Sequence, residues 1–402
     1  MSRKGNTRIK SIVFLGDTGF PNGWAAVQRV TLLGRSLINV GCEVRVVCRL
    51  GVWKKDLKTD YGKEGVHEGI PYRYTVDSPF RPDDSLERKY QKLKGLVCEF
   101  FYLVELKRKG RLDAVILSTL NFNDSLRYKI YSIIMGFPIV SNFVEKSSAL
   151  KRRSSLSMRI SDWLMENWLI KRFDGVMPIS DKLFKLYSDL APTKPIMKVP
   201  VVCDYDKFSG IEKFSSEPYF LYCASIQFKE VAEFVLNAYQ SSKGSGKVKL
   251  YLLISGKQIE EISAFREEIN KRFPLGNVKL FSNIPYQELV QLFINADGLL
   301  IPLRPIEEDA ARFPHKIGEY LATGNPVVTT SVGEINAYFK DGVTALVSKN
   351  YDVKEFSSKM DYILDNPEES RIIGKRGKEL GLKTFHFDNY GESIKDFIHD
   401  LL

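Results

Sequence analysis

The sequence predicts an α/β protein with two domains, each built on a doubly wound parallel sheet. Apolar strands alternate with amphipathic helical stretches along most of the 402 residues, and such alternation indicates parallel sheets. The alternation restarts after residues 202–216, where turn residues and charges gather without periodicity. The length also suits two or three domains. We therefore place the first domain at residues 1–205 and the second at residues 206–384.

The first domain is expected to open with an apolar strand at residues 10–16, then a loop, a helix over residues 24–40 and a strand over residues 43–48. We interpret the basic and then apolar N-terminus as this strand, because the apolar run breaks at Gly16 and no cleavage site of a secretion signal follows. A ligand is expected where the first loop meets the carboxyl edge of the sheet. Further strands are expected at residues 114–118, 138–143 and 175–180.

The second domain repeats this order from residue 218 onwards. Its expected strands lie at residues 220–225, 249–256, 278–281, 298–303 and 327–330, and its expected helices at residues 228–242, 264–273 and 287–296. The chain ends in a predicted helix over residues 385–402, because Tyr390, Ile394, Phe397 and Leu401 recur at helical spacing.

Composition limits the classes of protein to consider. Hydrophobic residues make up 44% of the chain, and no apolar run reaches the ~18 residues of a membrane-spanning helix. Five scattered cysteines without a C-x-x-C pair indicate a reducing compartment and no structural zinc. The expected location is therefore the cytoplasm. The net charge of +10 suits nucleic acid, an anionic membrane surface or acidic ligands, and does not choose among them.

The segment from Phe313 to Val328, FPHKIGEYLATGNPVV, carries the strongest functional signal. Pro314 suits the first position of a helix, and the N–H groups of a first helical turn favour an anion such as a diphosphate. Lys316 adds a positive charge there, while the Glu319 carboxylate suits the vicinal hydroxyls of a ribose. Gly324 is expected to end the helix before a buried strand. Diphosphate and ribose together indicate a nucleotide. The alternative is an ordinary amphipathic helix with a proline start and a glycine stop.

This string closely resembles the donor-nucleotide segment of glycosyltransferase family 4, a large group of retaining enzymes. The resemblance covers nearly the whole chain and is strongest at residues 298–347. It implies the GT-B fold, in which two Rossmann-like domains face each other across a cleft, with the last helix packed back on the first domain. It also implies that Glu319 binds the nucleotide ribose. The backbone of Phe313, Pro314, His315 and Lys316 would then lie against the sugar and the diphosphate.

The loop after the first strand of the second domain matches the family in part. Family members often carry an arginine and a lysine there, which neutralise the leaving diphosphate. This chain matches at Lys229 but has Ser225 where the arginine is common, and Arg312 and Lys257 are the candidate substitutes. A solvated lysine at a helix start is the alternative for Lys229. Its expected place at the carboxyl edge of the sheet favours a functional role.

Two other positions bear on the donor site. In the first domain, the loop containing Gly23 resembles the family's glycine-rich loop, although a simple strand-to-helix turn would look the same. The strict G-x-G-x-x-G pattern of a dinucleotide enzyme is absent. The family also often has a glutamate eight residues before Glu319, where this chain has Ala311. We interpret that gap as a divergence in donor contacts.

No metal site and no cofactor are expected. Asp204 and Asp206 form a D-x-D pair, which in the other major glycosyltransferase fold holds a divalent ion. Here the pair falls in the presumed linker, where the resembled family has a turn without a metal role. The four histidines are widely separated and suggest no metal cluster.

Two basic segments lie in the first domain, at residues 87–111 and 151–173. In the second of these, apolar residues share a broad helical face and basic residues surround it. The apolar residues are Leu156, Ile160, Trp163, Leu164 and Trp168, and the basic ones Lys151, Arg152, Arg153, Arg159, Lys171 and Arg172. Basic charge combined with tryptophan suits an anionic membrane surface. A helix that packs on the core and solvates its charged face is an equally good interpretation.

The resemblance therefore implies transfer of a sugar, with retention, from a nucleoside-diphosphate sugar to a glycan or lipid-linked hydroxyl acceptor. The setting would be polysaccharide synthesis for the cell envelope, in the cytoplasm or at the inner face of the membrane. Lys229 and Lys316, with the helix N-terminus, would stabilise the charge on the leaving diphosphate. Three alternatives remain: an inactive GT-B scaffold that binds nucleotide or a partner, a nucleotide-sugar epimerase, and a nucleic-acid binder. Ala311 and Ser225 support the first, and no recognition motif supports the last.

Overall fold

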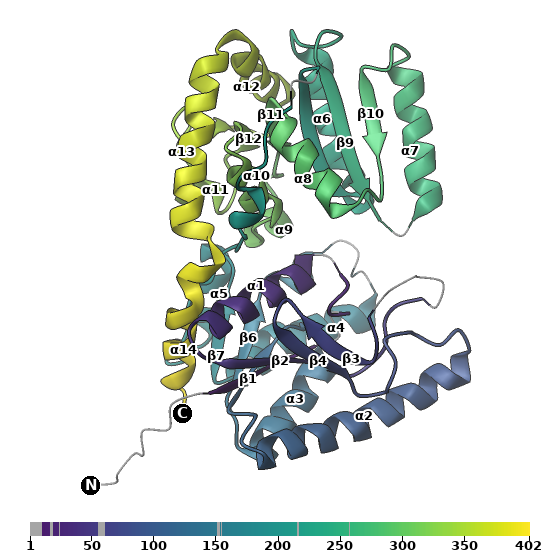
Figure 1. Ribbon diagram of the computed structural model, residues 1–402, viewed down its shortest axis with the longest axis vertical. Coiled ribbons are helices and arrows are strands. Elements are labelled where there is room, and N and C mark those ends of the chain that lie inside the picture. The colour runs from purple at the N-terminus through teal and green to yellow at the C-terminus, as the bar shows by residue number, and fades with distance from the viewer. Residues whose placement is uncertain are drawn as a thin grey trace. The chain divides into compact units, whose positions relative to one another are not determined.

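The computed structural model describes residues 10–16, 19–23, 25–54, 61–150, 153, 155–214, 217–256 and 258–402. The chain divides into two units. The first unit comprises residues 1–202 and 387–402, and the second comprises residues 203–386. Each unit contains one sheet (Figure 1). The sequence-based boundaries were residues 205 and 385.

The first sheet has seven strands in the order β3-β4-β2-β1-β5-β6-β7. Neighbouring strands are parallel except β3 and β4, which form an antiparallel hairpin at one edge. The strands are β1 Ser11–Leu15, β2 Glu43–Cys48, β3 Glu64–His67, β4 Ile70–Tyr74, β5 Ala114–Leu117, β6 Ile139–Phe143 and β7 Gly175–Pro178. The hairpin was not expected from the sequence, because β3 reads EGVH and lacks the apolar run of a buried strand.

Figure 1 shows α1 on one side of the first sheet and α2 and α3 on the other. The helices of the first unit are α1 Ala25–Asn39, α2 Ser85–Arg108, α3 Phe122–Met135, α4 Leu156–Leu164, α5 Asp181–Leu190 and α14 Gly391–His399. Shorter turns are η1 Ser147–Ala149, η2 Met165–Leu169, η3 Ile170–Arg172 and η6 Phe387–Tyr390. None of the described helices is long and apolar enough to span a membrane.

The end of the chain differs from the single helix expected over residues 385–402. Phe385 closes the preceding helix in the second unit, η6 follows, and α14 begins only at Gly391. The break has a packing reason: the Phe387 side chain enters the core of the first unit. The Ser36 hydroxyl donates to the Phe387 carbonyl at 2.8 Å, which fixes η6 against α1. Ile394 and Ile398 of α14 join the same core as Leu33.

The second sheet has six strands, all parallel, in the order β10-β9-β8-β11-β12-β13. They are β8 Tyr219–Ser225, β9 Lys249–Ser255, β10 Val278–Phe281, β11 Gly298–Ile301, β12 Val327–Thr330 and β13 Leu346–Ser348. The helices are α6 Lys229–Ser241, α7 Ile259–Arg272, α8 Tyr286–Asn295, α9 Glu307–Ala311, α10 Lys316–Thr323, α11 Ile335–Tyr338, α12 Val353–Asp365 and α13 Pro367–Phe385, with turns η4 Asp206–Phe208 and η5 Ile226–Phe228. The strands and helices expected in this half are present, so two α/β units with parallel sheets are confirmed.

Candidate functional site

The carboxyl edge of the second sheet gathers the residues that the sequence singled out there. β8 ends at Ser225, and η5 and the start of α6 follow it. The neighbouring strand β11 ends at Ile301 and leads to the segment that contains Arg312 and α10. Because β8 and β11 are parallel neighbours, both loops emerge at the same edge, where open α/β sheets bind their ligands.

Lys316 and Glu319 form an ion pair on the first turn of α10. Lys316 Nζ lies 2.7 Å from Glu319 Oε2. The hydroxyl of Tyr286, from α8, donates to Glu319 Oε1 at 3.3 Å. The Glu319 side chain is buried, whereas the Lys316 side chain keeps 31% of its surface exposed. The sequence predicted separate contacts for these two residues. The structure joins them into one pair.

The pair fixes the charge of Lys316. Burial alone would lower the pKa of Lys316, but the adjacent Glu319 carboxylate raises it, and the net shift is upward. Lys316 therefore carries its charge at neutral pH.

α10 begins at Lys316, two residues later than the start expected at Pro314. Pro314 and His315 form a tighter turn before it, in which Ile317 N–H donates to Pro314 O and Gly318 N–H to His315 O, both at 3.1 Å. Such i→i−3 bonds are common at helix starts. The predicted end is confirmed: Gly324 has φ of 80° and caps α10, and the buried strand β12 follows.

Phe313 anchors this segment through its side chain. The Phe313 ring is buried, lies parallel to the Tyr338 ring with centroids 5.7 Å apart, and meets the edge of the Phe385 ring at 5.4 Å. A donor can therefore meet the backbone of Phe313 but not its ring. Its role is to hold the chain where it enters α10.

Arg312 stands beside the loop that follows β8. Its Cζ atom lies 4.2 Å from the centroid of the Phe228 ring, and Phe228 immediately precedes Lys229. Its Nη2 pairs with Asp309 Oδ1 at 2.7 Å. Its Nε is buried without a hydrogen-bond partner in the described structure. Of the two substitutes proposed for the arginine missing at Ser225, Arg312 thus lies next to that loop, and Lys257 falls outside the described residues.

Arg304 is a member of the site that sequence reasoning missed. It is buried, and its Nε and Nη2 donate to the two carboxylate oxygens of Asp309 at 2.8 and 2.9 Å. A second ion pair joins it to Glu230 near the start of α6. Asp309 therefore bridges Arg304 and Arg312. The only sequence signal was an arginine five residues before an aspartate in an acidic stretch, and such a pattern does not say which charges pair.

Lys229 begins α6, but its ammonium points to α7. Its Nζ lies 2.6 Å from Glu268 Oε2 and 4.9 Å from the centroid of the Phe265 ring. The predicted contact of Lys229 with a diphosphate would require the lysine to leave Glu268. At Ser225, the hydroxyl accepts the N–H of Gln227 at 3.4 Å and so caps η5.

Gly23 lies in the first unit, exposed in the loop that leads to α1. Two other glycines of this loop have left-handed backbone conformations, Gly16 with φ of 131° and Gly19 with φ of 83°. A Cβ on Gly16 would lie 2.8 Å from the carbonyl oxygen of Ser118, after β5. Gly16 and Gly19 are therefore the closely packed glycines of the loop, and Gly23 is exposed ahead of the helix.

Asp204, Asp206 and His386 offer ligand atoms that all lie within 4.8 Å of one another. A backbone hydrogen bond brings these residues together: Cys203 N–H, next to Asp204, donates to the carbonyl oxygen of Phe385, next to His386, at 2.8 Å. Asp204 Oδ1 accepts the N–H of Asp206 at 3.2 Å, which is the turn expected from the sequence. Burial raises the pKa of Tyr286, the partner of Glu319, and Asp204 lies close enough to Tyr286 that the carboxylates of Glu319 and Asp204 both raise this pKa further.

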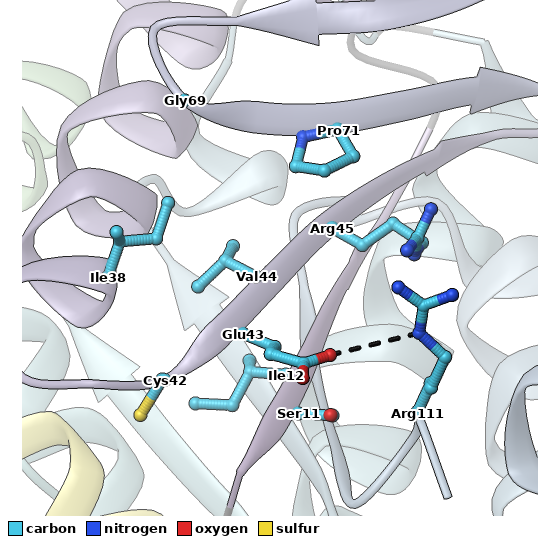
Figure 2. Close-up of a pocket in the computed structure, with 10 residues that line it drawn as sticks. All are labelled: Ser11, Ile12, Ile38, Cys42, Glu43, Val44, Arg45, Gly69, Pro71 and Arg111. Carbon is cyan, nitrogen blue, oxygen red and sulfur yellow. Dashed lines mark ion pairs between the residues drawn. The ribbon is translucent and has the colours of Figure 1, made fainter. Parts of the chain in front are cut away.

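A pocket of about 250 Å³ lies in the first unit at the amino ends of β1, β2 and β4 (Figure 2). Ser11 and Glu43 start two of these strands, and Glu43 pairs with Arg111 at 3.8 Å on the pocket wall. Ligands of open parallel sheets bind at the opposite, carboxyl edge. This pocket is therefore not a candidate for the nucleotide.

The comparison with known families bears directly on the second unit. The family model for glycosyl transferases group 1 matches residues 205–380, nearly all of that unit. The second unit is a group 1 glycosyltransferase domain. The protein is accordingly an enzyme of the glycosyltransferase class. The match includes Lys229, Arg312, Lys316 and Glu319, and Gly23 lies outside it.

Solved structures resemble this glycosyltransferase over the whole chain. Sucrose-phosphate synthase from Thermosynechococcus elongatus is similar over 98% of this chain and 99% of that one, with a TM-score of 0.73 at 15% identity. Anabaena HepE in complex with UDP and glucose is similar over 97% and 100%, with a TM-score of 0.70 at 13% identity. A glycosyltransferase from Rickettsia africae is similar over 98% of both chains, with a TM-score of 0.70 at 12% identity. These likenesses establish the GT-B fold. No curated protein matches the sequence.

Proposed function

We propose that this glycosyltransferase belongs to the retaining family 4. It would bind a nucleoside-diphosphate sugar on its second unit and transfer the sugar to a hydroxyl acceptor. One observation carries the proposal: Arg312 lies 4.2 Å over Phe228, beside the loop where the resembled family places a diphosphate-binding arginine. Arg312 is also four residues from Lys316, so two cations flank the turn that opens α10.

The reaction breaks the bond between the anomeric carbon and a diphosphate oxygen, and negative charge builds on the leaving diphosphate. Fixed cations and helix N-termini stabilise such charge more in the transition state than in the ground state. Arg312, Lys316 and the first turn of α10 would supply this stabilisation, with Lys229 joining when it exchanges Glu268 for the diphosphate. The leaving diphosphate would accept the acceptor's proton during attack from the same face, which retains the anomeric configuration. With these cations in place, we expect no metal requirement.

UDP is the first nucleotide to test. HepE was solved with UDP and with UDP-glucose, and an Escherichia coli protein similar over 98% of this chain was solved with UDP-2-fluoro glucose. Glu319 would accept the ribose hydroxyls. A glycan or lipid-linked acceptor of the cell envelope is the proposed acceptor class, and it rests on the sequence resemblance.

The first experiment is thermal stabilisation of the purified protein by UDP, GDP, ADP and their sugars, with and without magnesium. A ligand at 100 times its Kd stabilises by about 2.7 kcal/mol, which is roughly 5–10 °C in Tm for a unit of this size. We expect one diphosphate to give this shift without magnesium, and Glu319→Ala and Arg312→Ala to remove most of it. Arg371→Ala is the matched control, because Arg371 is an exposed arginine on α13.

Absence of a shift with every nucleotide would contradict donor binding and favour the inactive scaffold. A shift that needs magnesium would contradict the metal-independent mechanism. Once an acceptor is found, the anomeric coupling in the proton NMR spectrum of the product distinguishes retention from inversion.

A further inference from the structure

Helices α2, α3 and α4 expose a concentration of large apolar side chains. Thirteen of the 22 exposed large hydrophobic residues in the described chain lie on these helices and on η2, which continues α4. We call these thirteen residues the apolar face. They are Leu86, Tyr90, Leu93, Val97, Phe101, Ile130, Ile133, Ile134, Leu156, Met158, Ile160, Trp163 and Trp168. Scattered exposed hydrophobic residues need no explanation, but a concentration marks a binding surface.

α2 carries two apolar stripes on opposite sides. Its buried residues Gly95, Leu103 and Leu106, with Glu99, face the rest of the unit. The members of the apolar face on α2, from Leu86 to Phe101, recur every three or four residues and are 50–71% exposed. A surface helix needs one apolar stripe to pack on its core. The second stripe of α2 is therefore available to something outside the fold.

α4 is inverted relative to an ordinary surface helix. Its only buried residue is the charged Asp162, whose carboxylate accepts two bonds from Arg153 Nε and one from Arg153 Nη2 at 2.6–2.9 Å. Leu156, Ile160 and Trp163 point outward, and Trp163 is 60% exposed. Of the two interpretations of this segment from the sequence, core packing of its apolar face does not occur. Lys151 and Arg152, which the sequence placed around this face, lie outside the described residues.

The three helices are neighbours. α3 contacts both α2 and α4. The rings of Phe100 on α2 and Tyr131 on α3 have centroids 5.2 Å apart, and those of Phe122 on α3 and Trp168 on η2 are 6.2 Å apart. The apolar face is therefore spread over adjoining elements and not over separate corners of the unit.

Basic residues accompany the apolar face. α2 has six basic and three acidic residues, and one of the acidic residues, Glu99, is buried. Lys89, Lys92 and Arg108 of α2 and Arg159 of α4 are exposed. The guanidinium of Arg172 lies 3.8 Å over the Trp168 ring. A second copy related by two-fold symmetry would bring these cations against one another. An anionic lipid surface attracts them, while its acyl region accepts the apolar side chains.

We propose that the apolar face docks the first unit onto an anionic membrane surface, with α2 and α4 lying in the lipid interface. Tryptophan and aliphatic residues would enter the boundary between headgroups and acyl chains, and the lysines and arginines would contact the headgroups. This attachment needs no membrane-spanning helix. It rests on the first unit alone and is independent of which sugar is transferred.

The test is flotation of the full-length protein with vesicles of phosphatidylcholine alone, and of phosphatidylcholine with about one third phosphatidylglycerol. We expect binding to the anionic vesicles only, weakening as salt rises. Lys89→Glu/Lys92→Glu should weaken the binding constant by about 30-fold or more, from roughly a factor of five per cation. Leu93→Gln/Phe101→Gln should weaken it by about 100-fold.

Two matched controls lie on the second unit. Ile259→Gln/Leu275→Gln removes exposed apolar residues and Lys375→Glu/Arg376→Glu reverses exposed charges. Both should leave vesicle binding unchanged, and all variants should keep the wild-type Tm. Equal binding to neutral and anionic vesicles, no binding to either, or equal losses in the controls would overturn the proposal. A dimer in sedimentation analysis that Leu93→Gln/Phe101→Gln disperses would assign the apolar face to a second copy instead.

Discussion

Arg312 owes its position to two neighbours of opposite character. The Arg312 guanidinium packs on the face of the Phe228 ring, and Asp309 forms an ion pair with its Nη2. Asp309 is in turn held by the buried Arg304. The sequence indicated Arg312 only because an arginine was missing at Ser225. It could not indicate Arg304, because side chains that pair only in the folded structure leave no periodic pattern in the sequence.

Asp309→Asn tests this arrangement through stability. Burial raises the pKa of Asp309. The hydrogen bonds from Arg304 and the charge of Arg312 lower this pKa by a larger amount, so the net shift is downward. A carboxylate whose folded pKa is lowered stabilises the fold above its unfolded pKa of ~3.9, and this stability is lost as pH falls through the folded pKa. Breaking a buried pair costs about 3–5 kcal/mol, or roughly 10 °C in Tm.

We therefore expect the Tm of Asp309→Asn to fall well below the wild-type value at pH 7, and the difference to shrink below pH ~4. Thermal melts of both proteins from pH 7 to pH 3 measure it. Asp365→Asn is the control, because Asp365 pairs with Lys243 on the surface, and such pairs are worth about 0–1 kcal/mol. A difference between wild type and Asp309→Asn that does not change with pH would mean that Asp309 does not act through its charge.

Some helices and strands could be predicted from the local sequence pattern, and others could not. The alternation of strand and helix located five strands of the second sheet but not β13, and Gly324 marked the end of α10 because a left-handed cap favours glycine. Local pattern failed where structure depends on distant partners. It missed the β3–β4 hairpin, whose first strand β3 is largely exposed, and it could not show that Lys229 turns toward Glu268, 39 residues away.

The packing of α13 on α10 makes a prediction at this scale. A Cβ on Gly374 would lie 2.7 Å from the backbone carbon of Asn325 and closer still to the carbonyl oxygen of Gly324, the cap of α10. An open helix position would gain up to about 1 kcal/mol from Gly→Ala. Here the backbone of Gly324 and Asn325 would have to move. We therefore expect Gly374→Ala to destabilise the protein by about 1–3 kcal/mol.

The shift should also reach the site, because Gly324 ends the helix that carries the Lys316–Glu319 pair. Urea unfolding measures the stability of Gly374→Ala, and titration with UDP measures its affinity. The neighbouring exposed change Lys375→Ala is the control and should alter neither. A Gly374→Ala protein as stable as wild type would show that α13 can move away from α10 without cost.

At the scale of the whole molecule, the two cores use separate residues. The first contains Phe14, Leu33 and Ile116, and the second contains Phe220, Leu300 and Phe356. The chain nevertheless returns at its end to complete the first core with Phe387, Ile394 and Ile398. The last residues therefore stabilise the first unit, which is distant from them in sequence, and the second unit does not contain them.

Removing residues 387–402 should destabilise the first unit and leave the stability of the second unit unchanged. Full burial of an isoleucine or phenylalanine side chain is worth about 1.5–3 kcal/mol, so losing three costs roughly 5–9 kcal/mol, comparable to the whole stability of a domain. The chain would also lose the bond from Lys395 Nζ to Val40 O at 2.8 Å. By calorimetry we expect the transition of the first unit to fall steeply or disappear. The transition of the second unit should persist and still rise with UDP, because its core and α10 are intact. If both transitions fell together, the units would unfold as one, and the C-terminal segment would stabilise the molecule through both cores.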